Sequence, residues 1–74
     1  MSTAPAAIGI LLNDRPHTLA EGATLLALLG ELGLAGRKGV AAAVNGDVVP
    51  RARWDAHRLA QGDRILLIRA TQGG

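Results

Sequence analysis

The order of apolar and turn-forming positions in the first third of the chain predicts a β-hairpin. Ile8–Leu12 is short, apolar and rich in β-branched residues, which is typical of a strand. Asn13–Pro16 favours a tight turn, because Asn and Asp cap their own backbone and Pro fixes φ. His17–Ala20 is then predicted to return as a second strand, which Glu21-Gly22 ends.

The next apolar segment has the spacing of a helix. Thr24 suits the N-cap position. Gly33 is placed to adopt the left-handed conformation that ends a helix, and Leu34 can fold back on the last turn. Between these two ends, leucines recur at i, i+3, i+4 and i+7, which predicts an apolar stripe along one side of an α-helix. The stripe consists of Leu25, Leu28, Leu29 and Leu32.

The second half of the chain predicts another hairpin and a final strand. Val40–Val44 is apolar and is followed by Asn45-Gly46, a dipeptide that favours a type I′ turn because both of its residues tolerate positive φ. Asp47–Val49 is the returning strand. Pro50 stops it, since proline cannot donate a hydrogen bond to a sheet. The last strand is predicted at Arg64–Ala70.

This order of elements predicts an α+β fold of the β-grasp, ubiquitin-like type. One helix would pack on one face of a mixed sheet of four to five strands, with the last strand in the middle. A chain of 74 residues allows only one domain. We expect this domain to span residues 1–70 and a flexible tail to follow at 71–74.

The last strand is apolar on both of its faces. Ile65 and Leu67 point to one face of the sheet, and Leu66 and Ile68 point to the other. Because one helix covers only one face, we expect the face of Leu66 and Ile68 to expose an apolar patch that docks a partner. Leu11 and the alanines at 41 and 43 are candidates for the same face. The loop around Trp54 or a second copy of the chain are the alternative covers.

The composition narrows the possible functions. The chain has no cysteine, which excludes a disulfide framework, a thiolate nucleophile and a cysteine metal site, and we expect a cytoplasmic protein. The net charge is only +2, and the sequence pI near 10.5 reflects how few groups titrate at alkaline pH. A nucleic-acid partner is not expected without a clustered basic face and stacking aromatics. The apolar stretch at 22–36 is too short to cross a membrane.

The body of the chain offers no evident catalytic set. His17 and His57 have no evident partner in the sequence, and no metal site is expected. The aspartates at 14, 47 and 63 suit turn capping, and no carboxylate pair suits acid–base chemistry. Arg51 and Arg53 could meet an acidic partner, although a solvated loop is the simpler interpretation.

What remains is Gly73-Gly74 at the end of the sequence. Two glycines have no side chains and accept positive φ, so they can pass through a narrow channel and present a bare carboxylate. ATP can convert that carboxylate into an acyl-adenylate, and a sulfur donor can convert the adenylate into a thiocarboxylate. This chemistry requires no cysteine in the chain itself.

From Ile10 to Gly74 the chain resembles the ThiS family, the sulfur carriers of thiamine thiazole biosynthesis. The V-P-R-x-x-W segment distinguishes this family from the small subunit of molybdopterin synthase, another Gly-Gly carrier. The matching residues are Asn13-Asp14, Ala43-Val44-Asn45-Gly46, Val49-Pro50-Arg51, Trp54, His57, Leu59, Gly62-Asp63 and Gly73-Gly74.

The resemblance implies a carrier that enzymes act upon, not a catalyst. An adenylating enzyme would activate Gly74 with ATP, a persulfide sulfur donor would convert it to the thiocarboxylate, and thiazole synthase would take the sulfur. Thr71, Gln72 and Gly73 would form the arm that carries Gly74, and no cofactor would be bound. Leu66, Ile68 and Leu11 are the candidate docking patch. Trp54, Asn45 and Pro50 are assigned to structure.

Two other functions stay open at the level of the sequence. The chain could carry sulfur for another pathway, of the molybdopterin type. It could also be a ubiquitin-like modifier or interaction module, in which Gly74 would form an isopeptide bond with a lysine.

Overall fold

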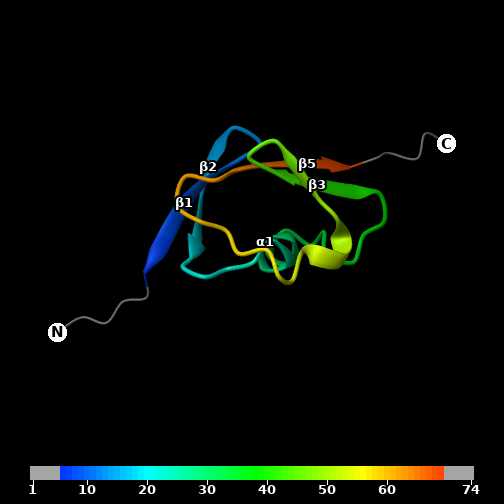
Figure 1. The fold of residues 1–74 in the computed structure, drawn as a ribbon, viewed down its shortest axis with the longest axis horizontal. Coiled ribbons are helices and arrows are strands. Elements are labelled where there is room, and N and C mark those ends of the chain that lie inside the picture. Colours follow the sequence, from blue (N-terminus) through cyan, green and yellow to red (C-terminus); the bar gives the residue numbers. More distant parts are fainter. Residues whose placement is uncertain (1–5, 70–74) are drawn as a thin grey trace.

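The computed structural model describes residues 6–69 and contains one mixed sheet and one α-helix, as predicted for a β-grasp fold (Figure 1). The strands lie in the order β2-β1-β5-β3-β4, so the last strand is central. It runs parallel to β1 and antiparallel to β3. The elements are β1 (Ala7–Leu12), β2 (Arg15–Ala20), α1 (Leu25–Glu31), β3 (Val40–Val44), β4 (Asp47–Val49), the 3₁₀ turn η1 (Arg51–Arg53) and β5 (Arg64–Arg69).

The turn between β1 and β2 is shorter than predicted. Only Asn13 and Asp14 form it, with φ of 49° and 66°, and Arg15 already pairs with Leu12. Pro16, which we expected in the turn, lies within β2 instead. A proline is tolerated there because β2 is an edge strand, where a missing N–H leaves no gap in the ladder.

Both predicted ends of the helix are confirmed. The Thr24 hydroxyl accepts a hydrogen bond from the N–H of Ala27 at 3.1 Å, as an N-cap does. At the other end Gly33 has φ of 74°, and the N–H of Leu34 donates to the carbonyl of Leu29 at 2.8 Å. This pair of features is a Schellman motif, which satisfies the last carbonyls of the helix.

The helix is short, and only part of the predicted stripe is buried. Leu25, Leu28 and Leu29 are fully buried against the sheet. Leu32 is the C-cap residue, one position beyond the end of the helix, and is 37% exposed.

The core lies between the helix and one face of the sheet. Trp54 is the largest side chain in it, and its indole N–H donates to the carbonyl of Val49 at 2.9 Å. No helix among residues 6–69 is long and apolar enough to cross a membrane. The buried apolar residues are Ile8, Ile10, Leu19, Leu25, Leu28, Leu29, Ala42, Val44, Val49, Trp54, Leu59 and Ile65.

Candidate functional site

The central strand divides its side chains between the core and the open face of the sheet. Ile65 is only 2% exposed, whereas Leu66 and Ile68 are 51% and 55% exposed. Alternation along β5 places the latter two on the face that α1 does not cover (Figure 1). The structure therefore leaves two large aliphatic side chains of its central strand in contact with solvent.

Strand register shows which other residues share this face. Ala43 pairs with Leu66 on one side and with Val48 on the other, so the three side chains point the same way. Val48 is 73% exposed. Leu11 pairs with Arg64, two residues before Leu66, and is partly buried on the same face. We call the set Leu11, Ala41, Ala43, Val48, Leu66 and Ile68 the apolar face.

Val48 was missed at the level of the sequence, although a signal for it existed. The Asn45-Gly46 turn has φ of 51° and 89°, as a two-residue hairpin requires, and it fixes the pairing of Val44 with Asp47. With that register, buried Val44 implies that the next residue along β4, Val48, points to the opposite face.

The loop around Trp54 does not cover the apolar face. Trp54 is buried on the helix side, and Leu26 N–H donates to the Trp54 carbonyl at 3.0 Å. In a second such contact, the N–H of Leu25 donates to the carbonyl of His57 at 2.8 Å. Figure 1 shows the segment after β4 crossing back over α1. This alternative cover for the patch is therefore wrong.

Arg51 is exposed, as expected for a solvated segment, but it also makes contacts with a structural role. Its Nη1 donates to the carbonyl of Ala35 at 2.7 Å, and its Nη2 donates to the carbonyl of Arg37. The guanidinium also stacks over the Trp54 ring, 4.6 Å from the ring centroid. Arg51 thus ties the segment between α1 and β3 to η1, while Arg53 remains exposed.

His17, His57 and Asp63 each make local contacts within the described residues. The Nε2 atom of His17 lies 4.0 Å from Glu31 Oε1 and has no hydrogen-bond partner there. His57 lies in the loop after η1, where its backbone caps the start of the helix. Between residues 6 and 69, no group of three His, Asp or Glu side chains is placed to hold a metal ion. Asp63 caps a turn through its carboxylate, which accepts from the N–H of Ala60 at 2.8 Å.

The predicted reactive end lies outside the described residues. Thr71, Gln72, Gly73 and Gly74 follow β5, whose last described residue is Arg69. In the sequence, these four residues come shortly after Leu66 and Ile68 of the apolar face. A β-grasp domain with an apolar open face and a Gly-Gly end defines the general class, that of small ubiquitin-like proteins.

Comparison with known proteins specifies the family within this class. A model of the ThiS family matches residues 10–74. The sulfur carrier protein ThiS of Escherichia coli (strain K12) is 40% identical over 65 residues, which cover 88% of this chain and 97% of that protein. The chain therefore belongs to the ThiS family, which makes it a small sulfur carrier protein and not itself a catalyst.

Solved structures agree with this assignment. A crystal structure of the thiamine biosynthesis protein ThiS from Geobacter metallireducens superposes with a TM-score of 0.76 at 29% identity, covering 90% of this chain and all of that one. A solution structure of a thiamine biosynthesis protein from the same organism gives a TM-score of 0.74 at 29% identity, covering 90% of this chain and 88% of that one.

Proposed function

We propose that this chain is the sulfur carrier of thiamine thiazole biosynthesis and that the carboxylate of Gly74 is its reactive group. The observation that carries the proposal is the family match, which extends to Gly74 itself. The E. coli relative is named a sulfur carrier protein and the Geobacter relatives are named thiamine biosynthesis proteins, which supports the same pathway.

The proposed chemistry takes place on the terminal carboxylate in three steps. The Gly74 carboxylate attacks the α-phosphorus of ATP on an adenylating enzyme, which releases pyrophosphate and leaves an acyl-adenylate. A persulfide sulfur then attacks the carbonyl carbon, AMP leaves, and a second thiol cleaves the resulting acyl disulfide to give the thiocarboxylate. Thiazole synthase takes this sulfur and the carboxylate is regenerated. ATP is therefore a substrate of the partner enzyme, and the carrier holds no cofactor.

The apolar face is the proposed docking surface for both enzymes. Leu66 and Ile68 expose about half of their surface. Burying these apolar side chains against a partner would favour association. They precede Thr71, Gln72 and Gly73 by only a few positions in the sequence, so an enzyme that covers them would be within a few residues of Gly74 along the chain. We place this chemistry in the cytoplasm, in line with the cysteine-free sequence.

An intact-mass measurement tests the reaction. The protein is incubated with ATP, the adenylating enzyme of the same organism and a persulfide donor. We expect a mass gain equal to the replacement of one oxygen by sulfur, and no gain after deletion of Gly74. Gly36→Ala is the matched control, because Gly36 has open space around its backbone and an ordinary φ. No mass gain in the unaltered protein would contradict the proposal.

A second experiment, on cell extract, separates the carrier from a conjugated modifier. A modifier would form isopeptide bonds with lysines, and immunoblots of cell extract would show a ladder of larger species. A carrier gives a single small species. Reconstituted thiazole synthesis distinguishes the thiamine pathway from a molybdopterin-type pathway.

A further inference from the structure

The acidic and basic residues of this chain are unevenly distributed along the sequence. The segments 32–44, 48–54 and 64–69 contain none of the six Asp and Glu residues, yet they contain most of the eight Lys and Arg residues. The net charge of +2 does not reveal this uneven distribution, because the carboxylates in other segments offset most of the positive charge. The separation becomes a surface feature only where these segments converge.

They converge at the end of the sheet where β5 terminates. Arg51 binds the carbonyls of Ala35 and Arg37, which holds the segment after α1 against η1. Arg69 pairs with Val40 at the start of β3, two residues after Lys38. Figure 1 shows this segment, η1 and the end of β5 at the same end of the molecule. We call the exposed residues Arg37, Lys38, Arg53 and Arg69 the basic end.

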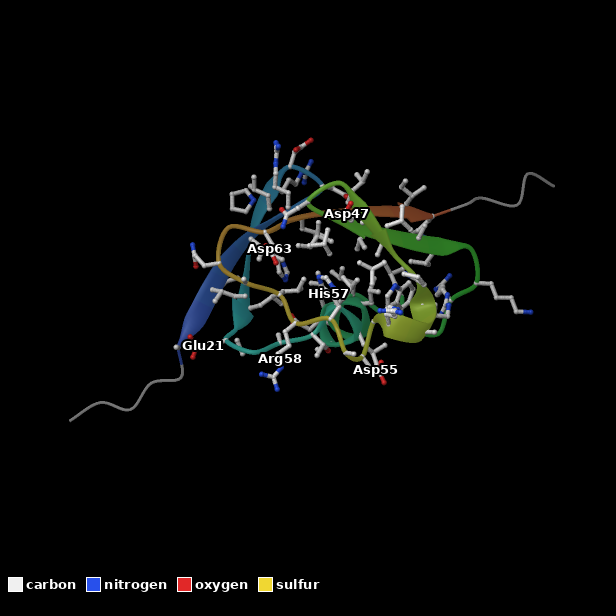
Figure 2. All side chains as sticks on the ribbon, viewed as in Figure 1. Glu21, Asp47, Asp55, His57, Arg58 and Asp63 are labelled. Carbon is white, nitrogen blue, oxygen red and sulfur yellow. The ribbon has the colours of Figure 1, made fainter. Side chains whose placement is uncertain are left out.

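Carboxylates gather where β5 begins. Asp63 directly precedes the strand, and its Oδ1 accepts a hydrogen bond from the side chain of Asn45, the turn residue two positions before Asp47. Asp14 lies in the other turn, beside Asn13, whose N–H donates to the carbonyl of Ile65 at 2.9 Å. Asp55 follows η1 in sequence, and Figure 2 shows it on the helix side, pointing away from the sheet.

The cations of the basic end have no acidic partner within the part of the chain that the structure describes. The ion pair found among residues 6–69 joins His17 and Glu31. Four like charges with no carboxylate among them repel one another, a cost that water and salt screen in the free protein. An acidic surface placed against them would remove that cost and gain attraction.

We propose that the basic end receives an acidic surface of the enzyme that adenylates the chain end. This inference rests on the function proposed above and deepens it by assigning the charge of the partner. Residue 70 follows Arg69 directly in the sequence. An acidic rim around the entrance of the enzyme's active site would therefore orient the carrier with its last residues toward that entrance. Electrostatic complementarity of this kind sets orientation and association rate. A second copy of the chain fits less well, because two of the carboxylates that it could present where β5 begins, Asp14 and Asp63, are directly followed in sequence by Arg15 and Arg64, which offset their charge.

The test is a binding measurement that does not depend on turnover. The dissociation constant for the adenylating enzyme of the same organism is measured by calorimetry at about 0.05 and 0.5 M NaCl, where screening differs strongly. The variants are the double substitution Lys38→Glu/Arg53→Glu and the control Arg58→Glu. Arg58 is exposed in the loop beside Thr24, away from the end of β5 (Figure 2). Circular dichroism checks that each variant is folded.

We expect the double substitution to raise the dissociation constant about tenfold or more at low salt, because it removes the electrostatic attraction. We expect the control to change the dissociation constant less than about threefold. Salt should weaken binding of the unaltered protein and have less effect on the double variant. Equal losses of affinity in the double variant and the control, or an affinity that does not depend on salt, would overturn the proposed role of the basic end. Salt-dependent retention on duplex DNA, lost in the double variant while enzyme binding is kept, would overturn it in favour of nucleic acid.

The mass measurement on the same proteins keeps the two proposals distinguishable. Loss of the sulfur-dependent mass gain in the unaltered protein contradicts the carrier function. A normal mass gain together with charge-independent binding contradicts only the basic end.

Discussion

Two asparagines at the hairpin turns do more than supply positive φ. The side chain of Asn45 donates to Asp63 and accepts from the N–H of Arg64, each at 2.9 Å. The side-chain oxygen of Asn13 accepts a hydrogen bond from the N–H of Leu67 at 2.8 Å, and its side-chain nitrogen donates to the carbonyl of Leu67 at 3.4 Å. Each amide side chain therefore acts as an extra peptide unit beside β5, where the neighbouring strand has already turned away.

We expect Asn45→Gly to lower the free energy of unfolding by about 1–2 kcal/mol, because it keeps the backbone conformation and removes two hydrogen bonds. Urea denaturation measures the change. Asp14→Gly is the matched control, since Asp14 also has positive φ, at 66°, but its side chain forms no hydrogen bond found among residues 6–69. Similar losses in both variants would show that the turn backbone, and not the side-chain bonds, is responsible.

At the scale of the element, β5 places a core residue and the proposed docking residues on opposite faces within six residues. Ile65 on one face is buried in the core, and Leu66 and Ile68 on the other are about half exposed. The alternation of a strand makes these roles independent, because successive side chains never share a face. The strand can therefore expose apolar side chains on one face without losing core packing on the other.

The double substitution Leu66→Asp/Ile68→Asp should change the free energy of unfolding by less than about 1 kcal/mol, since both sites are exposed. It should abolish measurable binding to the adenylating enzyme, because two charges would have to be buried. Calorimetry and urea denaturation give the two quantities. Ile65→Asp, on the buried face, is the contrasting variant and should unfold the protein. Unchanged enzyme binding by the folded double variant would contradict the assignment of the apolar face.

At the scale of the whole molecule, the buried core and the proposed reactive group are at different places in the chain. Among residues 6–69, the buried core residues lie between Ile8 and Ile65. Gly74 lies nine positions beyond the last of them. The folded domain thus carries the apolar face and the basic end, while the proposed chemistry takes place at Gly74.

Removal of residues 71–74 should therefore change the free energy of unfolding by less than about 0.5 kcal/mol, as expected away from buried contacts. The same truncation should abolish the sulfur-dependent mass gain completely. Urea denaturation and intact mass report on the two effects. A stability loss well above this limit would mean that the last residues pack against the domain, contrary to the separation described here.

The sequence by itself determined the element order, both hairpins, the two helix ends and the family. These follow from local chemistry: Asn-Gly and Gly33 adopt positive φ at little cost, and Thr24 has the hydroxyl that an N-cap requires. It also indicated that β5 is apolar on both faces. The turn at Asn13–Pro16 was predicted two residues too long, because a proline signals a turn unless its strand lies at the edge of a sheet.

Only the tertiary structure decided which residues meet across the sheet. Pairing through Ala43 places Val48 and Leu66 on the same face of the sheet with Ala43 between them, and the hydrogen bonds of Arg51 anchor an exposed segment to the loop after α1. The basic end is likewise invisible in a net charge of +2, since it is formed by segments that are distant in sequence. The physical reason is common to all three: local propensity acts between neighbours in the chain, whereas faces, anchors and charge clusters arise from contacts between distant segments.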